Sequence, residues 1–409
     1  MVSTDHNELE KRLIAWRRDF HQHPEAGFAT ERTAGIVADE LRGMGYEVET
    51  FPESNGVIGT LGGDEGPCVL LRADMDALRI QETSGHDFAS VNHGIMHACG
   101  HDAHTAMLLG GAALLAEAES LPGTVKVLFQ SAEEGARPDE EFPRKHPDAE
   151  EGERYTCGSL HMIDGGALDG VDACFALHVS GEHPTGKLAV PAEAAMASSD
   201  MFEVTFKGKG GHAALPHLSV DAVLMAARAV TELKMLVTRG VDPLQPVIVN
   251  VGSIHGGDAN NAICEEVTIN GTIRTHNAGV RAYLVEKVRE TCEQVAAMAG
   301  GSIEWLLQKG LPPLGNDPEM AKFAVQALND FLGEGTASLA TVPHMGAEDF
   351  AFFAERRPSA FCWLGVRNEE RGIIHNIHSP QFDVDEDALL VGARAHAAFA
   401  QAFLTTHAD

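Results

Sequence analysis

Hydrophobic positions in the first 190 residues alternate between helical and strand spacing. Apolar residues recur every three or four positions from Asn7 to His21, which predicts an amphipathic helix. Further helices are predicted from Thr30 to Gly43, where glycine ends the pattern, and after His101. Short runs typical of strands lie between them, and the last two are typical of buried strands. These runs are YEVETF from Tyr46, VIGTL from Val57, CVLLRA from Cys68, TVKVLF from Thr124 and CFALHV from Cys174. Strands interleaved with helices predict an α/β fold centred on a layered sheet.

The pattern changes after Pro191. Strands that alternate apolar and polar residues follow, as half-exposed strands do, separated by two long helices. The predicted order is MFEVTFKG from Met201, a helix over Ser219 to Val237, PVIVNVG from Pro246, EEVTINGTIRT from Glu265, a helix over Gly279 to Met298, and SIEWLL from Ser302. This β-α-β-β-α-β order is the ferredoxin-like arrangement. We therefore predict a discontinuous α/β domain over residues 1–192 and 308–409, interrupted by an inserted α+β domain over residues 193–307.

Charge and composition exclude several classes of partner. The 409 residues are enough for more than one core, and a formal net charge of -30 disfavours binding to nucleic acid or to anionic membranes. No stretch is apolar enough to span a bilayer, and the N-terminal residues lack the apolar segment of a secretory signal. Seven scattered cysteines, an odd number, favour reduced thiols in the cytoplasm over a disulfide framework.

Three histidines and one cysteine lie close together in the segment MHACGHDAH. Cys99 and His101 flank Gly100, and a backbone bend at glycine lets a thiolate and an imidazole face one metal ion. Asp102 is placed either to cap the following helix or to orient an imidazole. A buried cysteine beside solvent-facing histidines is the alternative, and it explains so dense a cluster poorly.

Paired carboxylates follow two predicted strands. Glu133 and Glu134, in FQSAEEG, end a strand at the position where α/β sheets place active sites. One carboxylate can bind a metal while its neighbour takes a proton from water. Asp74 and Asp76, in LRADMDAL, face the same side of an extended chain. Taken alone, the first pair is also typical of an acidic loop, and the second of a helix cap or a loop ion pair.

Single histidines are weaker signals. His178, in ALHV, ends a buried strand and by itself is more typical of a hydrogen-bonded core histidine. His378 lies in IHSP, where Pro380 disfavours a helix, and His375 is an alternative candidate in the same segment.

Together these motifs resemble the M20 metallopeptidase family, in particular its amidohydrolase branch. That branch includes hippurate hydrolases, auxin-conjugate hydrolases, bacterial aminoacylases and acetyl-diaminopimelate deacetylases. The matching segments run nearly end to end. In order they are RRDFHQHPE from Arg17, RADMDAL, MHACGHDAH, QSAEEG, ALHV, GKGGHAALPH from Gly208, GGDANNAI from Gly256, GTIRT from Gly271, GAEDF from Gly346 and IHSPQFD.

The resemblance implies two divalent metal ions per chain, with Mn²⁺ or Zn²⁺ expected and Co²⁺ or Ni²⁺ as further options. Cys99 matches the ligand shared by both metals, and Glu133 matches the general base that deprotonates the metal-activated water. Asp76 matches a carboxylate that the family keeps behind the site. The full implied ligand set is Cys99, His101, Glu134, His178 and His378.

The inserted domain resembles the family's lid and dimerisation domain, which implies a homodimer. His212 matches an imidazole that reaches the scissile carbonyl, often in a neighbouring subunit's site, where it would stabilise an oxyanion. Asn261 and Arg274 match residues that hold the substrate, and a guanidinium suits a bidentate grip on a carboxylate. Without the resemblance, Arg274 would be interpreted as a solvated arginine on a strand. Asn261 would be interpreted as an asparagine that turns the chain.

These features predict a metal-dependent amidohydrolase that cleaves the amide bond of N-acyl-L-amino acids or similar conjugates. A dipeptidase or carboxypeptidase of the same family, and a catalytically silent metal-binding relative, are the alternatives. Three departures from the family pattern stand out. Ser131 and Cys264 each replace a usual proline, and an acidic segment over Pro138 to Tyr155 extends the chain just after the paired glutamates. Its charge, its prolines and its lack of periodicity predict a surface loop.

Overall fold

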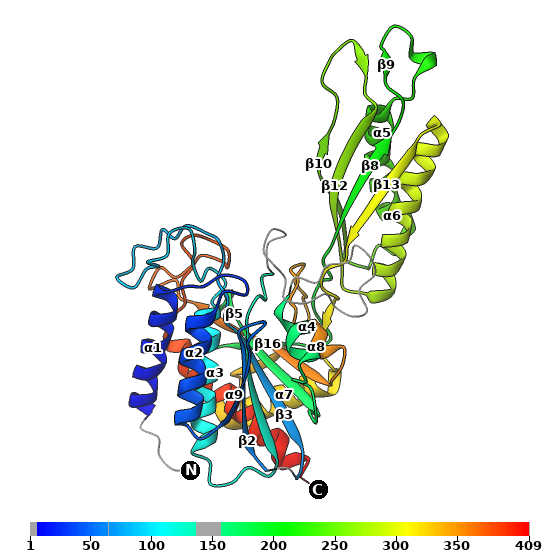
Figure 1. Cartoon of the computed structure of the whole chain (residues 1–409). Helices are drawn as coiled ribbons and strands as arrows, with labels where there is room; N and C mark the ends of the chain where they lie inside the picture. The colour runs from blue at the N-terminus through cyan, green and yellow to red at the C-terminus, as the bar shows by residue number, and fades with distance from the viewer. Residues whose placement is uncertain (1–5, 64, 136–156, 409) are drawn as a thin grey trace.

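The chain forms two layered units, shown in Figure 1 by a computed structural model that describes residues 6–63, 65–135 and 157–408. The large unit contains an eight-stranded sheet and the small unit a four-stranded sheet. The small unit extends away from the large one, and the chain after it returns to the eight-stranded sheet. This architecture confirms the predicted α/β class with an α+β insertion.

The sheet of the large unit places the ends of several strands along one edge. Its order is β1 (Glu47–Phe51), β2 (Gly56–Gly62), β4 (Thr124–Gln130), β3 (Cys68–Asp74), β5 (Ala173–Pro184), β16 (Ser359–Arg367), β6 (Leu188–Pro191) and β15 (Ala337–Ala340). Strand β3 runs parallel to both β4 and β5, and β5 runs parallel to β16. The carboxyl ends of these four strands therefore lie at the same edge of the sheet. Open α/β sheets bind ligands at this edge.

Helices cover both faces of this sheet. One face carries α1 (His6–Gln22), α2 (Glu31–Gly43), α3 (His101–Ala116), α7 (Pro318–Leu332) and α9 (Asp387–Thr406), and the other carries α4 (Gly158–Asp164) and α8 (Ala351–Ala354). Alternate residues of β3 enter the two cores, with Val69 and Leu71 on one side and Leu70 on the other. Helix α3 is buried along most of its length because it packs against α1, α9 and the sheet.

The small unit has the predicted ferredoxin-like order. Its elements are β8 (Asp200–Lys207), α5 (Ala222–Gly240), β10 (Val247–His255), β12 (Glu266–Thr275), α6 (Ala278–Ala299) and β13 (Ser302–Gln308), with strand order β10-β12-β8-β13. Helix α5 begins at Ala222, three residues later than predicted, because the Asp221 side chain caps it by accepting a hydrogen bond from the Leu224 amide. At the far end, β9 (Gly211–His212) pairs with β11 (Ala262–Ile263).

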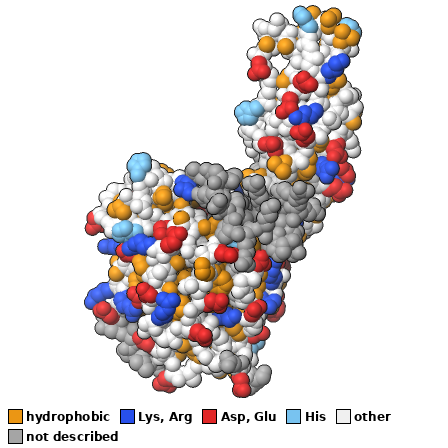
Figure 2. Space-filling view, viewed as in Figure 1, with side chains coloured by type: hydrophobic (Ala, Val, Ile, Leu, Met, Phe, Trp, Pro, Cys, Tyr) orange, Lys and Arg blue, Asp and Glu red, His pale blue; other side chains and the backbone are white. Residues whose placement is uncertain are grey.

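Polar contacts join the two units at the end of β12. His276 donates from Nε2 to the carbonyl of His344 at 2.7 Å, and Arg274 donates to the carbonyl of Met345 at 3.1 Å. Short strands β7 (Ala194–Met196) and β14 (Leu314–Gly315) pair where the chain leaves and re-enters the large unit. Figure 2 shows acidic and basic side chains interspersed over the viewed face of the large unit. Among the described helices, none combines the length and apolar character needed to cross a bilayer.

Candidate metal centre

The backbone at Gly100 turns two side chains toward one site. Gly100 has φ +88° and precedes α3, and a Cβ there would overlap the Val179 side chain, so glycine is required. This agrees with the bend expected between Cys99 and His101. His97, His101 and His104 are all buried, which excludes the alternative of solvent-facing histidines in this segment.

Asp102 orients an imidazole and does not cap the helix. Gly100 occupies the N-cap position, and no side chain caps it. The Asp102 carboxylate instead accepts hydrogen bonds from Arg17 Nε at 2.9 Å and from His21 Nδ1 at 2.8 Å. The helix-cap alternative is therefore wrong, and the imidazole that Asp102 orients belongs to α1.

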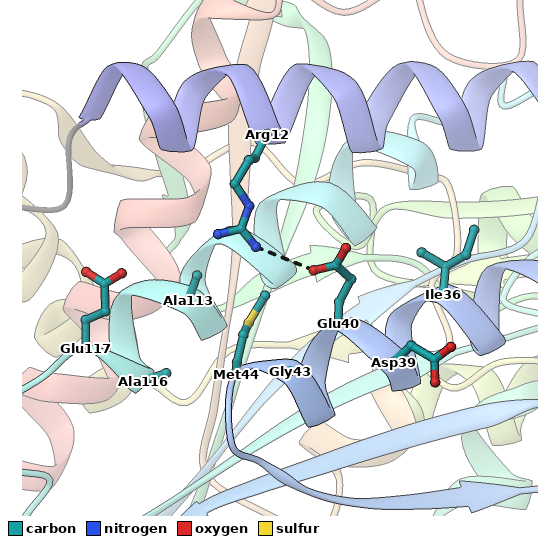
Figure 3. Close-up of a pocket in the computed structure, with 9 residues that line it drawn as sticks. All are labelled: Arg12, Ile36, Asp39, Glu40, Gly43, Met44, Ala113, Ala116 and Glu117. Carbon is teal, nitrogen blue, oxygen red and sulfur yellow. Dashed lines mark hydrogen bonds and ion pairs between the residues drawn. The ribbon is translucent and has the colours of Figure 1, made fainter.

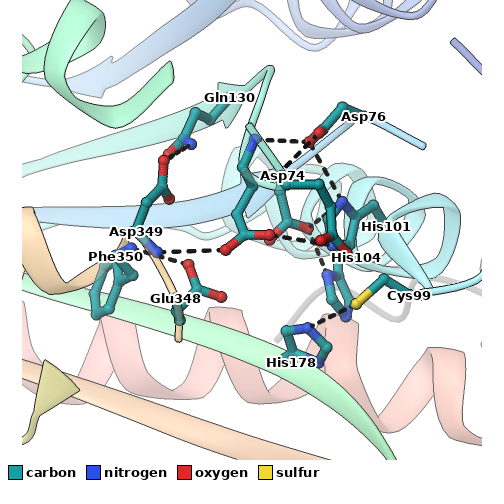
Figure 4. A network of polar contacts seen from close by, with 12 residues as sticks. Asp74, Asp76, Cys99, His101, His104, Gln130, His178, Glu348, Asp349 and Phe350 are labelled. Carbon is teal, nitrogen blue, oxygen red and sulfur yellow. Dashed lines mark hydrogen bonds and ion pairs between the residues drawn. The ribbon is translucent and has the colours of Figure 1, made fainter. Parts of the chain in front are cut away.

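Two groups of three side chains share the thiol of Cys99. The first triad is Cys99, His101 and His178, and the second triad is Cys99, Glu134 and His378; in each, the three ligand atoms lie within 4.8 Å of one another. The Cys99 Sγ is 3.4 Å from His178 Nε2, and His378 Nε2 is 3.0 Å from a Glu134 oxygen. Figure 4 shows Cys99 and His178 pointing toward one another beside His101 and His104. All five ligand candidates predicted from the sequence therefore meet at one place, whereas His375 belongs to neither triad.

The chemistry of the triads fits metal ions. Neither ring nitrogen of the buried His101 side chain makes a hydrogen bond of good geometry to a described residue, and the Asp76 oxygen near Nδ1 is 3.4 Å away. Buried polar groups nearly always have a bonding partner, so these nitrogens are expected to have a partner such as a metal ion. Burial, together with Glu134 and Glu133, raises the pKa of the Cys99 thiol well above its usual value. A divalent cation reverses that effect, because it deprotonates a coordinating thiol.

Glu133 is buried beside the triads. One of its oxygens accepts a hydrogen bond from the Asp349 amide at 3.3 Å, and the other lies 3.9 Å from His101 Nε2. Burial and the charges of Glu348 and Glu134 raise the pKa of Glu133 well above its usual range. Asp76 accepts hydrogen bonds from the backbone amides of Glu133 and Glu134, so it lies directly behind the paired glutamates. A nearby cation would favour the ionised form of Glu133 and leave a base next to the metal-binding atoms.

Two non-glycine residues of the site have left-handed backbones. Ala132, just before Glu133, has φ +51°, and His378 has φ +64°. Such conformations cost free energy and persist where the surrounding structure enforces them, often at functional sites. The amide of His378 donates to the carbonyl of Ala98 at 2.7 Å. This hydrogen bond holds His378 next to Cys99 in spite of their long separation in sequence.

A buried charge cluster lies behind the triads, as Figure 4 shows. Arg72, on β3, contacts Asp74 at 2.6 Å, Asp349 at 2.7 Å and Glu348 at 3.0 Å, and all four side chains are almost fully buried. Burial raises the pKa of Asp349 to about 8, although Arg72 opposes the shift. Arg72, Glu348 and Asp349 had no predicted role, although they lie in the RADMDAL and GAEDF motifs.

The residues predicted to contact the substrate lie away from the triads in the fold. His212 is exposed on β9 at the far end of the small unit, where its Nδ1 accepts a hydrogen bond from the Ala214 amide at 3.0 Å. Asn261 lies beside it, because its carbonyl accepts from the Ala213 amide. Arg274 lies at the opposite end of the small unit, against Met345. Among the described residues, none of these three contacts a member of either triad.

Two pockets differ in their relation to the site. One of about 710 Å³ lies between α1, α2 and the end of α3, and Figure 3 shows Arg12 paired with Glu40 across it. It contains no member of the triads. Another, of about 240 Å³, is lined by Ala26, Gly27, Ala77 to Ile80, Glu134 and Gly135, and so reaches the second triad. The acidic segment over Pro138 to Tyr155 lies outside the described residues.

A cysteine–histidine–carboxylate cluster at the carboxyl edge of an α/β sheet is typical of a metal-dependent hydrolase. The chain belongs to peptidase family M20/M25/M40, which its residues 70–402 match. It is 35% identical to thermostable carboxypeptidase 2 of Saccharolobus solfataricus, over 98% of each chain. It is 36% identical to the N-acetyl-L-cysteine deacetylase of Bacillus subtilis, over 93% of this chain and 86% of that protein.

A solved structure shares the whole architecture. The Bacillus subtilis YXEP protein, a dinuclear metal binding peptidase of the M20 family, superposes with a TM-score of 0.82 at 32% identity, over 98% of this chain and 99% of that one. These relatives confirm the fold class, the family and the enzyme class that the motifs predicted.

Proposed function

We propose that this enzyme hydrolyses the amide bond of N-acyl-L-amino acids. One observation carries the proposal: two triads of candidate metal ligands share the Cys99 thiol, and the buried carboxylate of Glu133 lies beside them. The deacetylase relative, which is named for an N-acetyl amino acid, supports this substrate class. Cys99, His101 and His178 would hold one divalent cation, and Cys99, Glu134 and His378 the other.

The donor set suits more than one metal. A thiolate and imidazoles suit zinc, and the carboxylate suits manganese, so Zn²⁺ or Mn²⁺ is proposed, with Co²⁺ or Ni²⁺ as alternatives. When bound, a pair of divalent cations polarises the amide carbonyl and lowers the pKa of a water molecule toward neutrality.

Glu133 would move the proton in this reaction. Its carboxylate would accept the proton of the attacking water and pass it to the nitrogen of the leaving amino acid. The Asp349 amide and the Asp76-bound backbone hold Glu133 at the site, so its side chain needs little reorganisation. Arg274, with several guanidinium donors, would hold the free carboxylate of the substrate.

The distance of the small unit from the site favours a homodimer. We propose that residues 193–307 form a lid and dimerisation domain, and that residues 1–192 and 308–409 form the catalytic domain. The exposed tip with His212 and Asn261 would then enter the partner's site, where His212 would stabilise the oxyanion. Ile248 and Ile254, on the edge strand β10, are 38% and 48% exposed and offer a surface for strand pairing.

A carboxypeptidase is the second candidate, because thermostable carboxypeptidase 2 matches nearly the whole chain. Both candidates are tested by one substrate panel of acetyl-, benzoyl- and indoleacetyl-amino acids and dipeptides. Metal-stripped protein is assayed with Mn²⁺, Zn²⁺, Co²⁺ or Ni²⁺ added back. Metal-dependent release from an N-acyl amino acid is expected. Cleavage of dipeptides alone would move the assignment to the peptidase, and no turnover with bound metal would favour a silent relative.

A further inference from the structure

His104 lies one helical turn after His101 and uses both ring nitrogens. Its Nδ1 contacts an Asp74 oxygen at 2.5 Å, and its Nε2 accepts a hydrogen bond from the Val179 amide at 2.8 Å. An imidazole that accepts at Nε2 carries its proton on Nδ1, where Asp74 accepts it. The Asp74 contact therefore sets the tautomer of His104. The side chain is 1% exposed, so no solvent competes for either contact.

Val179 connects His104 to the first triad, because it directly follows His178 along β5. The amide held by His104 belongs to the peptide that joins His178 to Val179. His178 donates from Nδ1 to the Val179 carbonyl at 2.7 Å, which leaves the lone pair of Nε2 facing the Cys99 Sγ. The same valine packs against Gly100, between Cys99 and His101. A single backbone position thus joins His104 to the whole first triad.

The same geometry excludes a different role for His104. Asp74, His101 and His104 have ligand atoms close enough to hold a third cation. Both nitrogens of His104 already have hydrogen-bond partners, however, and Asp74 also binds Arg72. A third cation would have to break the Val179 contact or displace the proton shared with Asp74. His104 is therefore better suited to hold protein groups than a metal ion.

We propose that His104 is a positioning residue that, through Val179, fixes the orientation of His178 and so sets the affinity of the first triad for its metal. The inference rests on the ligand role proposed for His178. Hydrogen-bonded partners behind a ligand typically change metal affinity by about 10- to 100-fold when they are removed. Because His178 belongs to the first triad and not to the second, the effect should fall on one of the two metals.

The test titrates the metal-stripped full chain with Co²⁺ in competition with a chromophoric chelator. The thiolate-to-cobalt charge-transfer absorption reports binding at Cys99. His104→Leu removes both hydrogen bonds, His104→Asn is too short to span Asp74 and Val179, and His104→Gln can offer one donor and one acceptor. We expect one of the two dissociation constants to rise about 10- to 100-fold in the Leu and Asn variants, with a smaller change in Gln.

His396→Gln is the matched control, because it alters another buried histidine whose ring packs edge-on against Phe175. It should keep both wild-type affinities. A folded Leu or Asn variant with both wild-type affinities would overturn the inference, and the Asn variant decides if the Leu variant does not fold. A wild-type protein without the charge-transfer band would instead contradict the proposed ligand set.

Discussion

The Oδ1 atom of Asp76 lies 3.0 Å from the backbone nitrogen of Glu133 and accepts its hydrogen bond. The second oxygen of Asp76 accepts from the next amide, that of Glu134, at 3.2 Å. One buried carboxylate therefore fixes the backbone of both glutamates, directly after the left-handed residue Ala132. Because Glu133 and Glu134 have different proposed roles, their relative placement depends on Asp76.

Replacing Asp76 with asparagine should lower turnover more than substrate binding. Asparagine has one acceptor oxygen, so one of the two amides would face an NH₂ group and lose its partner. We expect kcat to fall about 10- to 100-fold, as for other residues that hold a metal site in place. Steady-state kinetics with metal analysis would check this. An unchanged kcat in Asp76→Asn would show that the backbone of the glutamates is held by other contacts.

Substitutions of the two paired glutamates should produce two different phenotypes. Glu133→Gln removes the proposed base and should lower kcat about 10²- to 10⁴-fold while both metals stay bound. Glu134→Gln is the matched control, because it weakens a proposed ligand of the second triad. Metal analysis after dialysis should show about one metal lost in Glu134→Gln and none in Glu133→Gln. Equal metal loss in the two variants would contradict the division of roles.

Part of the fold and part of the ligand set could be predicted from local signals in the sequence. Apolar periodicity located α1 to α3, β1 to β5 and the six main elements of the small unit, but it placed no individual element after Gln308. Cys99, Gly100 and His101 form a motif of adjacent residues. His178 and His378 gave weak signals alone, since one is a buried strand residue and the other a loop residue. Their roles came from the family resemblance.

The contacts behind the site could not be predicted, because they join residues far apart in the chain. Arg72 meets Glu348 and Asp349 only in the folded chain, and no spacing in the sequence encodes that contact. His104 gave a visible signal in MHACGHDAH, but its partner Val179 contributes only a backbone amide, which no residue type reveals. The choice for Asp102 between helix cap and imidazole partner also required the position of α1.

Activity should be restored by mixing two inactive variants if His212 acts in the partner's site. His212→Ala should lower kcat about 10²- to 10³-fold, as expected for a lost oxyanion donor, and should leave metal content unchanged. Mixed dimers of His212→Ala with Glu133→Gln would contain one site with both groups intact. Recovery of part of the wild-type rate after subunit exchange is expected. No recovery in verified heterodimers would show that His212 acts within its own chain or has no catalytic role.

The ion pair of Arg281 with Asp200 should stabilise the base of the small unit. Arg281 binds both oxygens of Asp200 at 2.7 Å, and the Asp200 carboxylate is almost fully buried. Arg281→Met should destabilise the protein by about 3 kcal/mol, because it leaves a buried charge unpaired. Arg289→Met on the same helix is the control, since its exposed pair with Glu293 should contribute about 0.3–0.5 kcal/mol. Urea unfolding curves would check both values, and equal effects would contradict a special role for the buried pair.

His396 should make the protein less stable in mild acid. Burial lowers the pKa of His396 to about 3, whereas an unfolded chain has a histidine pKa of about 6.5. Between these values the unfolded state binds more protons, so the contribution of this residue to stability is present above about pH 6.5 and is lost as the pH falls toward 3. His396→Gln removes this titration and should reduce the loss of stability between pH 8 and pH 5. Urea unfolding of both proteins at matched pH values and metal concentrations would show it. Parallel pH profiles would mean that His396 is protonated equally easily in the folded and unfolded states.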